Sequence, residues 1–326
     1  MTRTGPYDVV VLGGGLAGLT LARQLLLQRP ETKVLILEKR TFPVAEAAYK
    51  VGESTVEIGA HYLADVVKLK KHLVDAQLPK FGLRFFFNGG QESIADGTEV
   101  GTSEFFAAPG YQVDRGRLEN HLAKIVAESG AEFLTRAKVR KFHLNVNSDD
   151  WATHRVTYRH GDAEHIADCR WIVDASGRAG FLKRHLGLAE EIEHNVNAVW
   201  FRIGAEFRID KWSNDAVWQS RTGKVPRRWL STNHLLGRGY WVWIIPLASG
   251  ATSIGIVADP RVHPLAEMNR FEKAIGWLQK HEPLCAAKVV EYQERLQDFC
   301  ARNRLGYSCR EVFSTDRWAI TGEAGV

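Results

Sequence analysis

Short apolar runs and amphipathic stretches alternate over the first forty residues. Val9–Leu12 and Val34–Leu37 contain no polar residue, which is typical of strands buried on both faces of a parallel sheet. Between these runs, apolar residues recur at helical spacing, at Leu19, Ala22, Leu25 and Leu26. The pattern predicts a strand–helix–strand unit.

The rest of the chain changes pattern several times. Alternation predicts strands over residues 131–173, and an antiparallel, tryptophan-rich sheet from Asn197 to Val257. Residues 264–303 carry apolar positions at helical spacing and are predicted to be helices, whereas Trp318–Ile320 is predicted to be a strand. An aromatic sheet of this kind is typical of one wall of a pocket, although a plain core uses the same residues.

Composition narrows the classes of protein. The chain has 326 residues, 45% of them hydrophobic, and a net charge of +5, so we expect a globular protein that binds no nucleic acid. The four cysteines and twelve histidines lack the spacing of metal ligands, and no metal is predicted. No apolar run reaches membrane-spanning length, and the first strand leaves no room for a signal peptide, so we expect a cytoplasmic protein.

A glycine motif follows the first strand directly. Gly13, Gly15 and Gly18 fit the pattern G-x-G-x-x-G, and Glu38 ends the second strand. Such glycines allow a tight turn, a close approach of the backbone to a pyrophosphate, and close packing of helix on strand. The phosphates bind at the helix N-terminus, and the acid accepts hydrogen bonds from a ribose. The arrangement predicts a dinucleotide site and disfavours a 2′-phosphate beside Glu38. The alternative is a glycine-rich turn without a ligand.

Three further segments resemble those of flavoprotein monooxygenases. Arg115 begins an R-x-x-L-x-x-x-L helix, Asp174 ends a strand before Ala-Ser-Gly-Arg, and Gly322-Glu323-Ala324-Gly325 follows the last strand. The resemblance implies FAD, with Arg115 reaching the pyrophosphate. It also implies that Glu323 stands where this group usually has an aspartate that bonds the ribityl chain. The resemblance and the glycine motif together give these candidate cofactor contacts: Gly13, Gly15, Ala17, Gly18, Glu38, Arg40, Ser54, Arg115, Asp174, Gly322 and Glu323.

This resemblance also implies the fold. We expect an α/β protein with a doubly wound FAD-binding domain, of the glutathione-reductase or aromatic-hydroxylase type, into which an antiparallel β layer with helices is inserted. The expected FAD domain covers residues 1–190, with an excursion at 41–110. The inserted substrate-side domain covers 191–310, and residues 311–326 return to the FAD domain, where we expect the chain to be truncated.

Two segments resemble flavin-dependent halogenases in particular. Trp241–Pro246 matches the motif W-x-W-x-I-P, and Val51–Thr55 reads V-G-E-S-T. About thirty residues later, Lys80 precedes Gly82-Leu83-Arg84-Phe85, as the lysine of these enzymes precedes a G-[IL]-R-F strand. Ser54 or Thr55 is expected to cap the helix that follows, and this turn also to line the flavin.

The resemblance to halogenases assigns Lys80 as the catalytic residue. In that family, reduced FAD, oxygen and halide give hypohalous acid, and the lysine passes the halogen to an electron-rich aromatic ring. The implied partners are a flavin reductase that supplies reduced FAD from outside, and an aromatic small-molecule or carrier-bound substrate. The second catalytic acid and the halide pocket of such enzymes are expected beyond residue 326.

Other interpretations stay open. The chain is alternatively an aromatic hydroxylase or another monooxygenase, or a prenyl-chain reductase of the same superfamily, or a flavin-binding module without catalytic activity. Lys80 is alternatively a solvent-facing lysine at the start of a strand. Trp241 and Trp243 are alternatively plain core residues.

Overall fold

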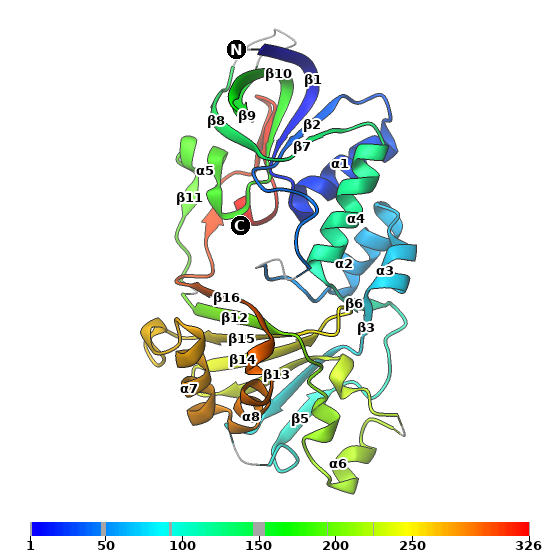
Figure 1. Cartoon of the computed structure of the whole chain (residues 1–326), viewed down its shortest axis with the longest axis vertical. Coiled ribbons are helices and arrows are strands. Elements are labelled where there is room, and N and C mark those ends of the chain that lie inside the picture. Colours follow the sequence, from blue (N-terminus) through cyan, green and yellow to red (C-terminus); the bar gives the residue numbers. More distant parts are fainter. Residues whose placement is uncertain are drawn as a thin grey trace. The chain divides into compact units, whose positions relative to one another are not determined.

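The structure is a computed structural model that describes residues 2–46, 50–90, 93–145, 154–193, 195–223 and 225–325. These residues form two compact units (Figure 1). Unit 1 comprises Met1–Ala45, Arg117–Glu193 and Tyr307–Val326, and unit 2 comprises Glu46–Gly116 and His194–Gly306. Residues 41–110, the expected excursion, therefore lie from Glu46 onward in the same unit as the antiparallel sheet.

Unit 1 is built on a mostly parallel sheet with the strand order β18-β19-β10-β1-β2-β7. The antiparallel strands β9 and β8 extend it from β10. The strands are β1 (Thr2–Leu12), β2 (Val34–Leu37), β7 (Glu132–Leu134), β8 (Ala137–His143), β9 (His154–His160), β10 (Ala163–Asp174), β18 (Phe313–Ser314) and β19 (Trp318–Ile320). Residues 146–153, within the segment expected to form strands, lie outside the described residues.

Helices and short elements complete unit 1. They are α1 (Leu16–Gln28), α4 (Arg115–Glu128), α5 (Phe181–His185), the 3-10 turns η2 (Gly177–Ala179) and η7 (Gly322–Ala324), and the ribbon of β11 (Ala189–Glu190) with β17 (Ser308–Cys309). The first two residues of α4 belong to unit 2. The predicted strand–helix–strand start and the predicted last strand are confirmed.

The central strands of unit 1 end together. Leu12 of β1 pairs with Leu37 of β2 on one side and with Asp174 of β10 on the other, and Asp174 pairs with Ile320 of β19. All four strands are parallel, so the segments that follow them emerge at one edge of the sheet. We call this edge, with the segments that follow these four residues, the carboxyl edge. In open α/β sheets this is where ligands bind.

Unit 2 contains a seven-stranded sheet with the order β16-β12-β15-β14-β13-β4-β5 and a ribbon of β3 with β6. The strands are β3 (Leu78–Lys80), β4 (Leu83–Phe87), β5 (Thr98–Gly101), β6 (Gly110–Gln112), β12 (Asn197–Ile203), β13 (Thr232–Gly237), β14 (Tyr240–Pro246), β15 (Thr252–Ala258) and β16 (Leu296–Arg302). Its helical elements are α2 (Glu57–His61), the π-helix η1 (Tyr62–Val66), α3 (Lys70–Ala76), η3 (Ile209–Lys211), α6 (Ala216–Ser220), η4 (Arg228–Leu230), η5 (Leu265–Glu267), α7 (Phe271–His281), α8 (Pro283–Glu291) and η6 (Gln293–Arg295).

The alternation of each strand sorts its side chains onto two faces of this sheet. On one face, Val199, Ile244 and Ile254 join the core that includes residues of α7 and α8. On the other face, Trp200 and Val257 form a smaller cluster, and Trp243 packs against it. The predicted antiparallel, aromatic sheet is confirmed, together with the α/β parallel sheet of unit 1.

The prediction of helices over the whole of 264–303 is wrong at its end. Helices α7 and α8 form, but Leu296–Arg302 is the strand β16, which pairs with β12. Its alternate residues Phe299 and Ala301 pack on the core, which is the period of a strand. Pairing with β12, which makes this segment the edge strand of the sheet, therefore overrides the local apolar spacing.

Candidate functional site

The first glycine motif sits at the carboxyl edge of unit 1. Gly13 has a φ of +115°, and a Cβ on Gly18 would lie 2.1 Å from the Gly13 carbonyl oxygen. Only glycine fits either position. Gly15 is the N-cap of α1 and has no side-chain cap, so the first N–H groups of this helix are open to a ligand. Such an N-terminus, bounded by glycines, fits a pyrophosphate.

Glu38 follows β2 at the same edge and is buried. Its carboxylate accepts hydrogen bonds from the backbone N–H of Gly14 at 2.8 Å, and from the backbone N–H and Nε of Arg40 at 2.8 and 3.0 Å. Burial raises the pKa of the Glu38 carboxyl, but these bonds and the charge of Arg40 outweigh it, so the pKa is lowered. Glu38 is thus an ionised acceptor. A carboxylate has further lone pairs, which fits a ribose hydroxyl.

Asp174 ends β10 and is fully buried. Its two carboxylate oxygens accept hydrogen bonds from the backbone N–H groups of Ser176 at 3.0 Å and Leu182 at 2.7 Å. The side chain therefore fixes the turn that leads into α5. Asp174 therefore determines the backbone conformation of this turn at the carboxyl edge.

The second motif packs directly on the first. A Cβ on Gly322 would lie 2.6 Å from the Cβ of Ala17 in α1. The carboxylate of Glu323 pairs with Arg178 at 3.6 Å, and its backbone carbonyl accepts from the hydroxyl of Tyr307 at 2.7 Å. The extra methylene of Glu323, compared with aspartate, thus carries its carboxylate to a partner within the protein. Gly13, Gly15, Ala17, Gly18, Glu38, Arg40, Asp174, Gly322 and Glu323 all lie at or beside the carboxyl edge.

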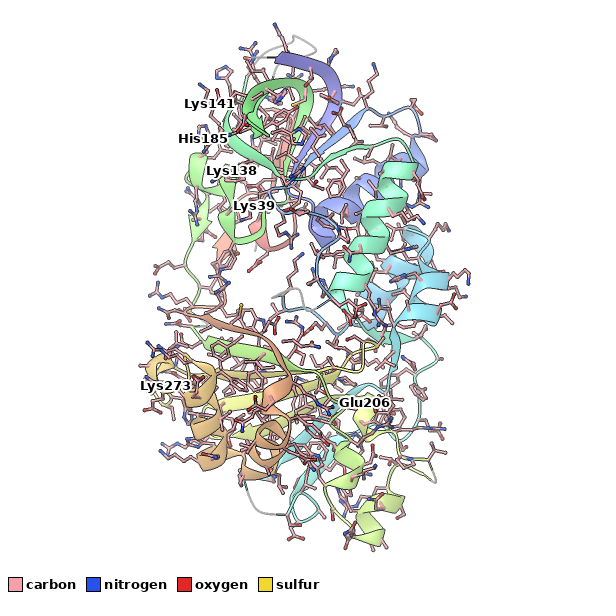
Figure 2. All side chains as sticks on the ribbon, viewed as in Figure 1. Lys39, Lys138, Lys141, His185, Glu206 and Lys273 are labelled. Atoms are coloured by element: carbon pink, nitrogen blue, oxygen red, sulfur yellow. The ribbon has the colours of Figure 1, made fainter. Side chains whose placement is uncertain are left out.

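Lys80, the candidate catalytic residue, lies in unit 2 and is only 6% exposed. Its Nζ donates a hydrogen bond to the backbone carbonyl of Thr55 at 2.7 Å. Burial lowers the pKa of the Lys80 amine, and the charge of Glu57 partly opposes this. The alternative of a solvent-facing lysine is therefore wrong. By contrast, Lys39, Lys138, Lys141 and Lys273 are exposed on the surface (Figure 2).

The V-G-E-S-T segment lies beside Lys80 in unit 2. The Oγ of Ser54 contacts the Oγ1 of Thr232 at 2.6 Å, and Thr55 is bonded to Tyr111 through both its backbone and its side chain. The expected capping role is wrong, because α2 begins after the N-cap Val56, which has no side-chain cap. Arg115 donates to the carbonyl oxygens of Val51 at 2.5 Å and Gly52 at 3.4 Å. Ser54 and Arg115 are thus brought together with this segment.

A row of residues crosses the second face of the sheet in unit 2. Phe85 is opposite His234, His234 is opposite Trp243, Trp243 is opposite Gly255, and Gly255 is opposite Trp200. Directly opposite residues share a face, and we call this row the tryptophan face. A Cβ on Gly255 would lie 2.1 Å from the indole of Trp243, so this ring covers the backbone of Gly255. Trp243 keeps partial exposure, and Trp241, two residues before it, does likewise.

His234 is the polar member of the tryptophan face. Its imidazole stacks on Phe85, with 5.0 Å between the ring centroids. Burial lowers the pKa of His234 and the charge of Lys80 lowers it further, while the backbone groups of Arg84 and Thr232 oppose them. The histidine is therefore held neutral near Lys80.

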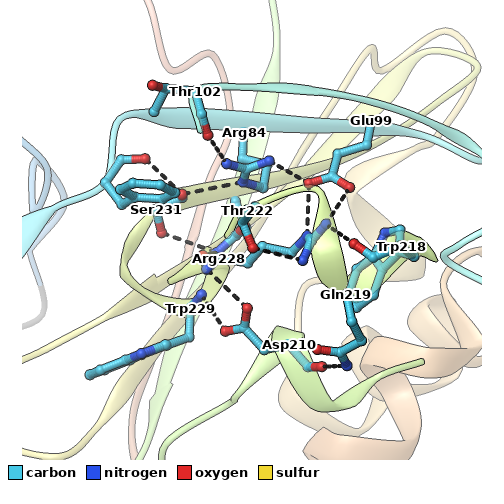
Figure 3. A network of polar contacts seen from close by, with 12 residues as sticks. Arg84, Glu99, Thr102, Asp210, Trp218, Gln219, Thr222, Arg228, Trp229 and Ser231 are labelled. Atoms are coloured by element: carbon cyan, nitrogen blue, oxygen red, sulfur yellow. Dashed lines mark hydrogen bonds and ion pairs between the residues drawn. The ribbon is translucent and has the colours of Figure 1, made fainter. Parts of the chain in front are cut away.

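The strand after Lys80 is fixed by a buried charge network (Figure 3). Arg84 and Arg228 share the carboxylate of Glu99: Arg228 donates to its two oxygens at 2.8 and 3.1 Å, and Arg84 pairs with one of them. Ser231 donates its hydroxyl to the carbonyl oxygen of Phe81 at 2.8 Å. The arginine of the lysine motif thus anchors β4 and, with it, the position of Lys80.

Sequence reasoning missed three residues of unit 2 that join these motifs. Glu53, Arg202 and Asp298 form a buried ion cluster, with each residue at most 4% exposed. A signal for it was present, because Arg202 interrupts the otherwise apolar run A-V-W-F-R-I of β12. A lone charge in a buried strand requires a partner.

Two features are absent from the described residues. No group of histidine, cysteine, aspartate or glutamate residues among them is placed to hold a metal ion. None of their helices is both long and apolar enough to cross a membrane.

Comparison with known proteins gives the following relatives. The family model described as "Lycopene cyclase protein" matches residues 8–190. The flavin-dependent halogenase chlA of Dictyostelium discoideum is 28% identical over 347 residues, which cover 98% of this chain and 55% of that protein. A 1H-pyrrole-2-carbonyl-(peptidyl-carrier protein) brominase of Pseudoalteromonas luteoviolacea is 26% identical over 329 residues. These residues cover 99% of this chain and 72% of the brominase. The crystal structure of halogenase PltM has a similar fold, with a TM-score of 0.76 and 19% sequence identity. The match covers 98% of this chain and 64% of the PltM chain. The chain thus spans about half the length of the first of these relatives.

Proposed function

Because the chain belongs to the flavin-dependent halogenases and, over residues 8–190, to the lycopene cyclase family, we propose that it halogenates an electron-rich aromatic substrate, with Lys80 as the catalytic residue. When bound, reduced FAD supplies the two electrons with which oxygen and halide give hypohalous acid. The halide is a co-substrate. All further steps rest on residues of this chain.

We propose that FAD is held by the residues predicted for it. For the carboxyl edge of unit 1 these are Gly13, Gly15, Ala17, Gly18, Glu38, Arg40, Asp174, Gly322 and Glu323. Ser54 and Arg115 lie in unit 2, and their assignment as cofactor contacts stays a prediction. The open N-terminus of α1 would bind the pyrophosphate, and the ionised Glu38 would accept from the ribose. Asp174 would act through the turn that it fixes, because both its oxygens already bind backbone N–H groups. Glu323 would act through its backbone, since its carboxylate pairs with Arg178.

The single observation that carries the proposal is the buried amine of Lys80. A lysine that is 6% exposed, with one backbone carbonyl as acceptor, is a poor surface charge and a good nucleophile. Its neutral amine would attack the halogen of hypohalous acid. The nitrogen–halogen bond forms, the halogen–oxygen bond breaks, and the oxygen leaves as water with a proton from the amine.

The second step returns the lysine to its starting state. A ring carbon of the substrate forms a bond to the halogen, and the nitrogen–halogen bond breaks. The ring loses its proton and the nitrogen gains one, so the amine is restored. The need for a carbon that attacks an electrophilic halogen explains why the proposed substrate is an electron-rich ring, free or bound to a carrier. We also propose that a partner flavin reductase supplies the reduced FAD.

Substitution of Lys80 tests the function. With reduced FAD, oxygen and bromide or chloride, wild-type protein should add halogen to indoles, phenols or pyrroles, as measured by product mass. Lys80→Ala should lower this rate by about a hundredfold or more while flavin reoxidation continues. Lys71→Ala is the control, because the side chain of Lys71 is 90% exposed. Undiminished halogenation by Lys80→Ala would remove the lysine from the mechanism.

The same assay separates the alternatives. A product that gains oxygen without dependence on halide would indicate a hydroxylase, and a saturated double bond would indicate a prenyl-chain reductase. FAD binding without any product would indicate a flavin-binding module without catalytic activity. Rapid reduction of bound FAD by NADPH alone would contradict the proposed reductase.

A further inference from the structure

Glu53 lies at the junction between the V-G-E-S-T segment and the sheet that carries the tryptophans. Its side chain is buried, and its Oε1 accepts a hydrogen bond from the Nε of Arg202 at 2.7 Å. Arg202 is held in turn by Asp298 and by the carbonyl oxygen of Lys50. Removing one member of a buried cluster of this kind leaves a buried charge without compensation, which is costly. The place of Glu53 against β12 is therefore strongly fixed.

A second set of contacts connects Glu53 to the tryptophan face. The indole Nε1 of Trp243 donates to the Oγ of Ser253 at 3.3 Å. Ser253 on β15 is directly opposite Arg202 on β12, and Arg202 is the residue that donates to the carboxylate of Glu53. Burial raises the pKa of the Glu53 carboxyl, although the charge of Arg202 and its hydrogen bond to Glu53 oppose this. The connection thus runs from Trp243 to Ser253 on β15, across to Arg202 on β12, and from Arg202 to Glu53.

The backbone continues this chain to Lys80. The carbonyl of Glu53 accepts from the N–H of Val113 at 2.6 Å, and the N–H of Thr55 donates to the carbonyl of Tyr111 at 2.9 Å. These bonds fix Thr55 against β6 and Glu53 against Val113, the residue that follows β6. The carbonyl oxygen of Thr55 then accepts the bond from the Nζ of Lys80 at 2.7 Å. A displacement of Glu53 would therefore move the acceptor that orients the amine.

We propose that Glu53 is a positioning residue that fixes the ring of Trp243 and the amine of Lys80 with respect to each other, so that Lys80 captures hypohalous acid before it escapes into water. This inference rests on the proposed halogenase function. It explains why V-G-E-S-T, the lysine and the tryptophans occur together: all three are parts of one connected arrangement within unit 2. A displacement of about 1 Å in such an arrangement costs about a hundredfold in rate.

Two variants test the positioning role. Glu53→Gln removes the charge that holds Arg202, and Ser253→Ala breaks only the connection to Trp243 and removes no charge. Thr252→Ala is the matched control, because Thr252 is equally buried and hydrogen-bonded but points to the other face, where it bonds Ala205 and Phe207. If Glu53→Gln fails to fold, Ser253→Ala still decides the outcome.

The first measurement is the ratio of escaped to transferred halogen. Hypohalous acid is trapped by an added scavenger and compared with the halogenated product from the same reaction. Ser253→Ala and Glu53→Gln should raise this ratio about tenfold or more, and Thr252→Ala should leave it unchanged. A loss of folded protein lowers both products equally and does not move the ratio. An unchanged ratio in both variants would overturn the inference.

The second measurement needs no flavin. The rate at which acetic anhydride acylates Lys80, relative to the exposed Lys71, reports how the amine is held. We expect this relative rate to change at least severalfold in Glu53→Gln and Ser253→Ala, and not in Thr252→Ala. If the wild-type protein makes no halogenated product at all, the proposed function fails, whereas equal acylation rates in all variants would refute the positioning role alone.

Discussion

The carboxyl edge of unit 1 and the tryptophan face of unit 2 are built from different materials. At the edge, the distinctive groups are largely backbone: the N-terminus of α1, the turn of Gly13 and the tight contact at Gly18. The tryptophan face consists of side chains, and buried charged residues such as Arg202 and Glu53 form an ion pair beside it. The edge is therefore specified by segments close in sequence, whereas Arg202 and Glu53 are 149 positions apart.

This difference predicts different weaknesses. A site of backbone groups should fail when a single carbon atom is added in the wrong place. A site of paired side chains should tolerate added volume at its margin and fail when one charge loses its partner. Three experiments, taken from the largest expected effect to the smallest, sharpen the contrast.

Gly18→Ala should have the largest effect. The new Cβ would lie 2.1 Å from the Gly13 carbonyl oxygen, which is backbone and has little room to move. We expect FAD affinity to fall about ten-thousandfold or more, about 5.5 kcal/mol, as measured by titration of flavin fluorescence. Gly276→Ala is the matched control, because Gly276 is also helical and has no atom within 4 Å of an added Cβ. That control should bind FAD normally and gain up to about 1 kcal/mol of stability. Normal FAD binding by Gly18→Ala would show that the edge is not backbone-limited.

Glu99→Gln should follow, with an effect on unit 2. The substitution leaves Arg84 and Arg228 buried without their shared carboxylate. Breaking a buried pair of this kind costs about 3–5 kcal/mol of unfolding free energy, measurable by urea denaturation. Glu206→Gln is the control: its pair with Arg208 is exposed and contributes at most about 1 kcal/mol. Equal losses in the two variants would contradict the importance given to the network.

The smallest effect concerns pH and a different buried acid of unit 2. Burial raises the pKa of Glu282 from its ordinary 4.5 to about 7, and the hydroxyl of Tyr240 donates to it at 2.9 Å. A raised pKa means that the contribution to stability is fully present below about pH 4.5 and is lost as the pH rises through 7. Between pH 6 and 8, wild-type protein should lose about 1 kcal/mol of unfolding free energy relative to Glu282→Gln. FAD affinity should stay level over this range, because the pKa of Glu38 is lowered and backbone groups do not titrate. Parallel pH curves of the wild type and Glu282→Gln would argue against a buried titrating acid.

Local sequence was sufficient for the elements of the carboxyl edge. Gly13, Gly18 and Glu38 lie within one strand–helix–strand unit, where spacing and periodicity determine the geometry. What spacing does not determine is where a carboxylate points, and the bond of Glu323 to Arg178 depends on a turn far away in the chain. The strand β16 was missed for a similar reason, since pairing with β12 decides its conformation.

Unit 2 was only partly predictable. The motifs that contain Lys80 and Trp243 could be identified, but burial of the lysine depends on how β3, β6 and the V-G-E-S-T segment pack. The ion cluster of Arg202 required three segments to meet, and no local pattern encodes such a meeting. The membership of His234 in the tryptophan face likewise follows from strand register alone.

The size of the residue at position 255 controls the position of the Trp243 indole. The indole of Trp243 lies over a residue with no side chain, and that residue is opposite Trp200 on the next strand. Any larger residue at position 255 would lift or turn the indole of Trp243 while the side chain of Lys80 stays unchanged. A small library at this one position, from alanine to valine, would therefore vary the shape of the face in graded steps, which makes Gly255 a natural starting point for changing the range of substrates by engineering.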